Sequence, residues 1–183
     1  MTFTDTHCHL ANPKLADTLP AVLAEAQAVG VARFIVPATS PKDWQAVAQL
    51  ERPSENIHIA LGIHPWFSDG LNEAAFQELE SELIRHPQAW VGEIGLDFYG
   101  KEQTQAQRDT QTDVFIRQLI LAQNLNRRVI IHNLKATAAI AAAVKTSGFT
   151  RGGIVHAFSG SVEEARILVK LGFKIGIGSL LLN

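Results

Sequence analysis

Cysteine, tyrosine and methionine are scarce in this 183-residue chain, which contains one of each. A single cysteine, Cys8, excludes an internal disulfide and is compatible with the reducing cytoplasm, where we expect the protein to reside. No apolar run approaches the roughly 20 residues that span a bilayer, and the N-terminal MTFTDTHCHL has no basic segment leading into an apolar one. We therefore expect a cytoplasmic protein without a membrane partner.

An excess of charge is also lacking. Lysine and arginine together number 16 and the acidic residues 18, which gives a net charge of −2. No general positive field is available to hold a polyanion through counterion release. If nucleic acid is the substrate, bound metal ions must supply much of the attraction. The length and the 46% hydrophobic share fit a single domain, residues 1–183, with a buried core.

Short apolar runs rich in β-branched residues alternate with helical patterns along the chain. The expected strands are Phe3–His7, Val31–Val36, Ile57–Ile63, Trp90–Ile94, Val129–Ile131, Gly153–Val155 and Phe173–Ile177. The expected helices are Leu19–Val29, Pro41–Leu50, Glu73–Arg85, Thr104–Asn124, Ala136–Lys145 and Val162–Leu171, several of them closed by a glycine. This alternation predicts parallel strands joined by right-handed crossovers.

Two α/β architectures fit such a pattern, an open doubly wound sheet and a closed barrel. The open sheet normally has a glycine-rich phosphate loop after its first strand, whereas here the first strand leads into His7-Cys8-His9. We therefore expect a TIM-type (β/α) barrel with polar ligands at the strand ends. A complete barrel takes about 250 residues and eight strands. The expectation is thus an incomplete barrel with about seven of the eight strands, lacking its C-terminal strand and helices.

Polar side chains recur at the carboxyl ends of the expected strands. Alternation along the first strand places Asp5, His7 and His9 on one face. A glutamate late in an apolar strand, Glu93, would carry a costly unpaired charge, for which a metal ion is the natural counter-charge. Barrel strands bring their carboxyl ends together. The expected metal ligands are His7, His9, Glu93, His132 and His156.

Three further polar residues lie near the same end and are expected to bind substrate or to orient the ligands: Asp5, His64 and Asp97. His64 adds one imidazole more than two metal sites need, and Asp97 fits a loop turn or helix cap equally well. Gly92 and Gly95 beside Glu93 predict close approach by backbone or ligand. Cys8, His58 and His86 are expected to have packing or surface roles and no part in the site.

The motifs DTHCHL, GIHPW, GEIGLDFY and HAFSG, with the His132 strand, resemble those of the TatD-like hydrolases of the amidohydrolase superfamily in order and spacing. The resemblance covers essentially the whole chain. It implies two divalent ions, one held by His7, His9 and Glu93 and the other by Glu93, His132 and His156. Glu93 would bridge the ions and be the catalytic carboxylate. Imidazole and carboxylate ligands leave zinc, manganese, iron, nickel and magnesium open.

The chain departs from the family pattern at three places. A serine or cysteine followed by arginine is common after the histidine at 132, whereas this chain has Asn133 and Leu134 and so lacks a candidate phosphate-binding guanidinium. Arg128 replaces a usual proline. The last metal-binding aspartate, in an ETD-like motif on the eighth strand, is missing. We therefore expect the 183-residue form to be truncated and largely inactive.

Three functions remain open on these grounds. The leading one is hydrolysis of ester bonds through a water activated by two metal ions, with DNA phosphodiesters or small phosphate esters as substrates. The second keeps the metals but cleaves amides or carboxylic esters. The third is an inactive metal-binding barrel. Nothing in the sequence indicates the oligomeric state.

Overall fold

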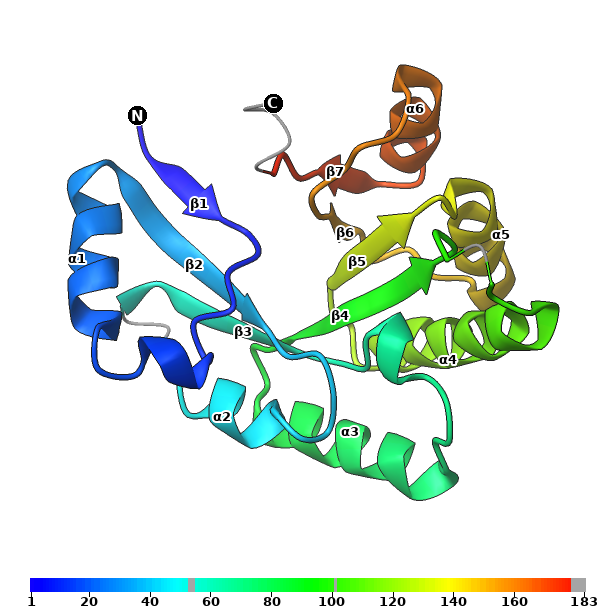
Figure 1. Ribbon diagram of the computed structural model, residues 1–183, viewed down its shortest axis with the longest axis horizontal. Coiled ribbons are helices and arrows are strands. Elements are labelled where there is room, and N and C mark those ends of the chain that lie inside the picture. The colour runs from blue at the N-terminus through cyan, green and yellow to red at the C-terminus, as the bar shows by residue number, and fades with distance from the viewer. Residues whose placement is uncertain (53–54, 101, 179–183) are drawn as a thin grey trace.

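The computed structural model describes residues 1–52, 55–100 and 102–178 (Figure 1). Its strands are β1 (Phe3–Asp5), β2 (Val31–Pro37), β3 (Ile57–Leu61), β4 (Trp90–Asp97), β5 (Val129–Leu134), β6 (Gly153–Val155) and β7 (Phe173–Ile175). Its α-helices are α1 (Leu19–Ala28), α2 (Trp44–Ala48), α3 (Glu73–Arg85), α4 (Gln105–Asn124), α5 (Thr137–Ser147) and α6 (Val162–Lys170), with short 3-10 helices η1 (Pro13–Leu15) and η3 (Pro65–Phe67). Strand and helix alternate as predicted.

The seven strands form one parallel sheet in the order β1 to β7, the same as their order in the chain. A doubly wound sheet reverses its strand order at a switch point, so the sequential order excludes that alternative. The sheet is curled into a half-barrel, and the helices follow one another around its outer face from α1 to α6 (Figure 1). The predicted TIM-type architecture, in an incomplete form with seven strands, is confirmed.

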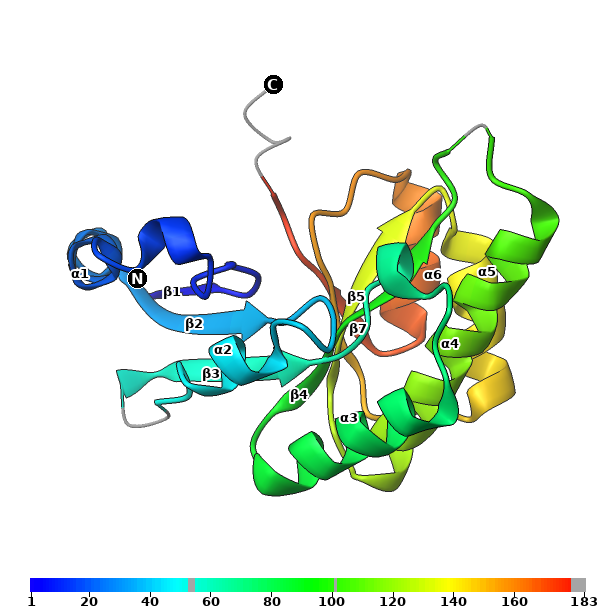
Figure 2. The same cartoon turned by 60° about the horizontal axis from the view of Figure 1, so that its bottom comes forward.

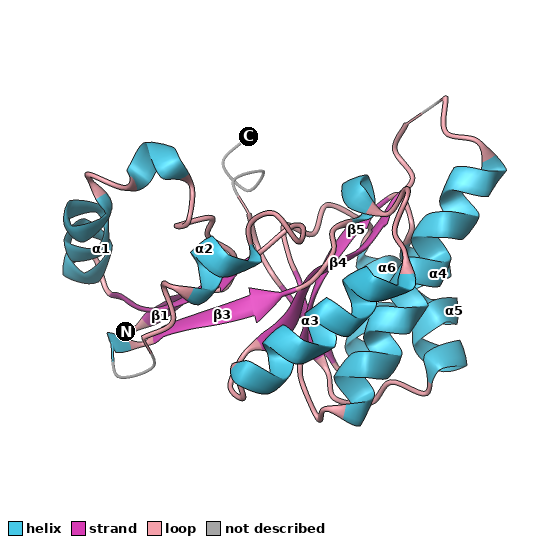
Figure 3. Cartoon of the chain, turned by 90° about the horizontal axis from the view of Figure 1, so that it is seen from below, coloured by secondary structure: helices cyan, strands magenta, loops and turns pink. Residues whose placement is uncertain are grey.

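Two further views show how the helices cover this sheet. The helices α4, α5 and α6 lie against the part of the sheet that contains β4 to β7 (Figure 2). Seen from below, α1 lies at the opposite end of the sheet, beyond β1 (Figure 3). None of the helices in the described parts of the chain is long and apolar enough to cross a membrane.

Two groups of buried apolar side chains lie on the two faces of the sheet. Alternation along β2 points Phe34 and Val36 outward to the helices and Ile35 inward, so both faces of the strand are covered. The larger, outer core includes Ile59, Leu61, Leu79, Ile94, Phe115, Leu119, Ile131 and Ile140. The smaller, inner cluster consists of Ile35, Ala60, Ile130 and Ile154, with Trp90 packed against it.

Helix ends follow local side-chain chemistry. Thr104 is the N-cap of α4 and forms a capping box with Gln107, so the helix begins one residue later than predicted. The helix predicted over Pro41–Leu50 is confined to Trp44–Ala48. Its predicted start is a turn instead, because the Asp43 carboxylate accepts hydrogen bonds from the backbone N–H groups of Thr39 and Ser40.

The first and third strands end earlier than predicted. Strand β1 stops at Asp5 rather than His7, and the Asp5 carboxylate accepts a hydrogen bond from the backbone N–H of His7 at 3.1 Å. The chain nevertheless stays beside β2, because the Cys8 N–H donates to the Ile35 carbonyl at 3.2 Å. Cys8 packs against the outer core as expected, and burial raises the pKa of its thiol to about 12.

Candidate metal centre

Five imidazoles and one carboxylate meet at the carboxyl ends of the strands. His7 and His9 follow β1, His64 follows β3, and His156 comes directly after β6. The remaining two side chains lie within strands, Glu93 in β4 and His132 in β5. The structure thus brings together all five predicted ligands and His64.

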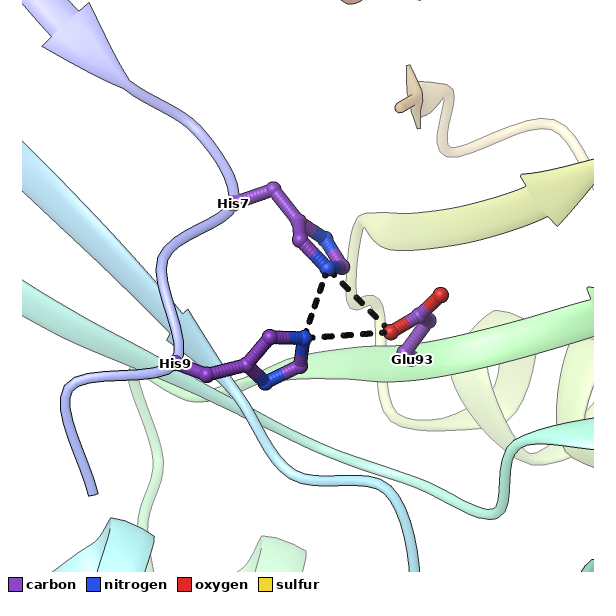
Figure 4. Close-up of side chains that lie close together, drawn as sticks. All are labelled: His7, His9 and Glu93. Atoms are coloured by element: carbon purple, nitrogen blue, oxygen red, sulfur yellow. Dashed lines mark hydrogen bonds and ion pairs between the residues drawn. The ribbon is translucent and has the colours of Figure 1, made fainter. Parts of the chain in front are cut away.

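The Glu93 carboxylate lies at the centre of this cluster, with its side chain only 4% exposed. Its Oε2 atom is 3.2 Å from His7 Nε2 and 3.9 Å from His9 Nε2. The two histidine nitrogens are themselves 3.1 Å apart. Figure 4 shows both imidazoles pointing toward each other and toward Glu93.

The other carboxylate oxygen of Glu93 faces a different set of imidazoles. Its Oε1 atom is 2.7 Å from His156 Nε2, 3.0 Å from His132 Nδ1 and 3.4 Å from His64 Nε2. The nitrogens of His156 and His132 that face Glu93 are 3.3 Å apart. Each oxygen of one carboxylate therefore belongs to its own group of imidazoles.

A bulge in β4 turns Glu93 toward the inner face of the sheet. Val91 pairs with Val129 and Ile94 with Ile131, so β4 contains one more residue than β5 between these pairs. An extra residue of this kind re-aims the side chains beside it. Simple alternation from Val91, which is part of the outer core, would have pointed Glu93 outward.

The glycines on either side of Glu93 permit β5 to approach. A Cβ atom on Gly92 would lie 2.8 Å from the Cβ of Ile130, and one on Gly95 would lie 2.0 Å from the His132 carbonyl oxygen. Gly95 also has a φ of +142°, a backbone conformation that residues with a side chain rarely adopt. The close approach predicted at these glycines is confirmed, and the approaching group is the backbone and side chains of β5.

The imidazoles determine the charge state of this site. Burial by itself raises the pKa of Glu93, but hydrogen bonds from His132, His156, His64 and His7 outweigh it and hold the pKa well below its ordinary value. Burial also lowers the pKa of His7, against the opposing effect of Glu93. An ionised carboxylate and a neutral imidazole are the forms that bind metal ions.

Asp97 lies behind the His132 ring. Its Oδ2 atom is 3.4 Å from His132 Nε2 and accepts a hydrogen bond from Trp66 Nε1 at 2.8 Å, while Oδ1 accepts one from the Tyr99 N–H at 3.1 Å. A carboxylate in this place can orient the ring and direct Nδ1 toward Glu93. Asp5, in contrast, is exposed and contacts the site only through the His7 backbone.

His64 is oriented by the start of η3. Its Nδ1 accepts a hydrogen bond from the Trp66 N–H at 3.1 Å. A neutral ring that accepts at Nδ1 carries its proton on Nε2, the atom that faces Glu93. His64 is therefore arranged to donate a hydrogen bond to the carboxylate and not to offer a lone pair to a metal ion.

A cavity of about 310 Å³ opens over the cluster. Besides the imidazoles and Glu93, its lining consists of Thr39, Trp66 and Phe67. The side chains of Trp66 and Phe67 are 71% and 44% exposed. No sequence pattern predicted these three residues at the site, although the GIHPW motif places Trp66 two positions after His64. Neither lysine nor arginine occurs among the described residues of this lining.

The donor atoms fit divalent cations. Two groups, His7 with His9 and Glu93, and His64 with Glu93 and His132, each have nitrogen and oxygen atoms within 4.8 Å of one another. In the second group His156 Nε2, 2.7 Å from Glu93 Oε1, can take the place of His64, whose Nε2 carries a proton. Two ligands bound at about 2.1 Å in tetrahedral geometry lie about 3.4 Å apart, close to the separations given above. His7 Nδ1 and His132 Nε2 are buried without a hydrogen-bond partner among the described residues. The cluster contains no cation of its own to balance Glu93 when its imidazoles are neutral.

The parallel half-barrel carries its buried carboxylate and imidazole groups at the carboxyl ends of its strands, where (β/α)-barrel enzymes have their active sites. The chain belongs to the TatD related DNase family, which matches residues 4–183. The family match and the fold together make it a metal-dependent hydrolase of this family.

Named relatives agree with this assignment. The chain is 35% identical over 178 residues to the "Uncharacterized metal-dependent hydrolase YjjV" of Escherichia coli (strain K12), with 96% of this chain and 68% of that protein covered. The crystal structure of YjjV superimposes with a TM-score of 0.90 at 34% identity, covering 99% of this chain and 70% of that one. A Danio rerio relative, tatdn3, has the word deoxyribonuclease in its name and is 29% identical over 181 residues, 93% of this chain and 67% of its own.

Proposed function

We propose that the chain hydrolyses phosphodiester bonds of DNA with two divalent ions, one held by His7, His9 and Glu93 and the other by Glu93, His132 and His156. The observation that supports this most directly is the division of the imidazoles between the two oxygens of Glu93. A carboxylate placed in this way is suited to bridge two cations. A single metal site would leave one group of imidazoles without a role.

The choice between His64 and His156 as a ligand rests on their protons. His156 Nε2 lies 2.7 Å from Glu93 Oε1, and His156 can carry its proton on Nδ1 and bind a metal ion through Nε2. The Trp66 N–H donates to Nδ1 of His64, so the proton of the His64 ring stays on Nε2. His64 would thus hold the carboxylate and contact substrate. Asp97, whose Oδ2 lies 3.4 Å from His132 Nε2, would orient the His132 ring.

Two bound ions would supply Lewis acidity that neutralises a phosphate and lowers the pKa of an attacking water. The chain's own residues prepare the place for this chemistry. The neighbouring imidazoles hold the pKa of Glu93 low, so that it stays ionised, and burial keeps His7 neutral. Trp66 and Phe67 form an exposed aromatic wall beside the cluster, on which a nucleotide base can stack.

A second candidate, hydrolysis of amides or carboxylic esters, is favoured by one feature of the site. The described lining of the cavity contains no basic side chain that would contact a phosphate. Leu134 stands where the family commonly has arginine, and Asn133 donates to Thr137 Oγ1 at 2.9 Å instead of pointing to a ligand. Neutral substrates would need no such cation.

The test is a set of hydrolysis assays on metal-depleted protein reconstituted with manganese, zinc or magnesium. We expect cleavage of single-stranded DNA and of bis(p-nitrophenyl) phosphate that depends on the added metal. Turnover of p-nitrophenyl acetate or a p-nitroanilide, without turnover of either phosphodiester, would replace the proposal with the second candidate. Bound metal without any turnover would favour a metal-binding barrel.

Replacing Trp66 with alanine is expected to raise the KM for a single-stranded oligonucleotide about tenfold, because stacking contributes about 1–3 kcal/mol per base. Trp66→Phe keeps a ring but loses the hydrogen bond to Asp97, so it should preserve KM and lower kcat. An oligonucleotide of abasic residues has no base to stack and is the matched control substrate. An equal rise in KM for that substrate would show that Trp66 does not bind bases.

A further inference from the structure

A second cavity, of about 530 Å³, lies at the amino-terminal end of the sheet. Its lining residues come from the beginnings of strands that are far apart in the sequence. Arg33 is in β2, His58 in β3 and Lys174 in β7, while Arg128 directly precedes β5. Arg151 lies just before β6 and completes the set of basic side chains.

This cavity is separate from the candidate metal centre, although both lie on the inner face of the sheet. Alternation along β5 places Arg128, Ile130 and His132 on that face, one after another. Ile130 is part of the buried inner cluster, whose members Ile35 and Ile154 also line the floor of the cavity. A layer of apolar side chains therefore stands between the basic residues and the imidazoles.

Among the described residues, no acidic side chain lines this cavity to balance its positive charge. Four of the 16 basic residues of an acidic chain line it, and no aspartate or glutamate is among its described lining residues. In the part of the chain that the structure describes, only Arg85 and Arg117 among the lysines and arginines form ion pairs. Arg33, Arg128, Arg151 and Lys174 are exposed and unpaired, and so can reach a common ligand.

Neutral polar groups complete the lining. Burial lowers the pKa of His58, and the neighbouring Arg33 lowers it further against the opposing effect of Glu51, so the imidazole is neutral near pH 7. Thr4 and Thr6 add hydroxyl groups that can donate or accept hydrogen bonds. The Arg128 guanidinium lies 5.6 Å from the centre of the Trp90 ring, which restricts its motion.

We propose that this cavity binds a polyphosphate anion, either inorganic or the phosphate chain of a nucleotide. Its volume is within the range of small-molecule sites, about 300–1,000 Å³. Three guanidinium groups and an ammonium group match the three or four negative charges of a diphosphate or triphosphate, and planar guanidinium groups pair well with phosphate oxygens. Monovalent anions would leave most of the positive charge unbalanced.

The test is isothermal titration of the full chain, freed of divalent metal, with inorganic pyrophosphate, ADP, inorganic sulfate and a single-stranded oligonucleotide. We expect pyrophosphate to bind at least tenfold more tightly than sulfate. Arg33→Gln and Arg128→Gln should each weaken pyrophosphate binding about tenfold. Arg166→Gln removes the same charge from the exposed face of α6 and should leave the affinity unchanged.

ADP that binds more tightly than pyrophosphate would identify a nucleotide as the ligand, and equal or weaker binding would identify the phosphate chain alone. Preferential binding of the oligonucleotide, with equal loss in all three variants, would overturn the proposal in favour of nonspecific charge attraction. Undetectable binding of pyrophosphate would also overturn it. These measurements use metal-free protein, in which Glu93→Gln should bind pyrophosphate normally, so they do not depend on the proposed hydrolysis.

Discussion

Replacing Glu93 with glutamine is expected to remove both divalent ions and, with them, hydrolytic activity. A carboxamide offers one oxygen where the carboxylate offers two, and its NH2 group cannot face a cation. The side chain also loses the negative charge that offsets two ions in a buried place. Loss of an outer-shell partner alone commonly costs 10- to 100-fold in metal affinity, so we expect a loss of about 100-fold or more here.

Metal analysis of reconstituted protein, with turnover of a phosphodiester in parallel, measures both effects. Glu80→Gln makes the same chemical change on the exposed face of α3 and should alter neither quantity. His9→Gln and His156→Gln extend the experiment, since each should release one ion and leave the other. Full metal content in Glu93→Gln would show that Glu93 does not bridge two sites.

Replacing Gly95 with alanine is expected to destabilise the metal-free protein by about 3 kcal/mol or more. The new Cβ would lie 2.0 Å from the His132 carbonyl oxygen, and the φ of +142° is unfavourable for any side chain. Backbone strain of this kind costs about 1–3 kcal/mol and overpacking a further 1–3 kcal/mol. This clash can be relieved only if β4 and β5 separate where Gly95 pairs with His132.

Denaturant unfolding in the absence of metal measures this cost without a contribution from ligand binding. Gly100→Ala is the matched control, because a Cβ there meets no atom within 4 Å in the described part of the chain. It should change the free energy of unfolding by only a few tenths of a kcal/mol, and in the stabilising direction if the loop accommodates it. Similar stability for Gly95→Ala and the native chain would show that β5 can move away without cost.

Some features of the site could be recognised in the sequence because they depend on position within a strand. His132 and His156 each come at the end of an apolar run, and parallel strands in a barrel bring such ends together. The HCH spacing likewise places His7 and His9 on one side, even though β1 ends before them. To predict that these residues converge, it was therefore enough to have the correct order of strands and helices and the correct barrel architecture.

Other features depend on how strands are aligned with one another. The bulge that turns Glu93 inward arises from the register between β4 and β5, which no local pattern records. Trp66 and Asp97 are 31 residues apart, and only the packing of η3 beside β4 allows their hydrogen bond. The extra His64 imidazole could be counted in the sequence, but its tautomer follows from the turn at η3.

By itself, the sequence determined the alternation of strands and helices, the incomplete-barrel class, and the six side chains that meet in the candidate metal centre, five of them as ligands and His64 beside them. These follow from periodicity and from residues at strand ends, which are local properties. Only the tertiary structure decided which oxygen of Glu93 faces which imidazoles, and that Arg33, Arg128, Arg151 and Lys174 surround one cavity. A net charge of −2 gave no sign of that cavity, because a total charge does not record where the charges lie.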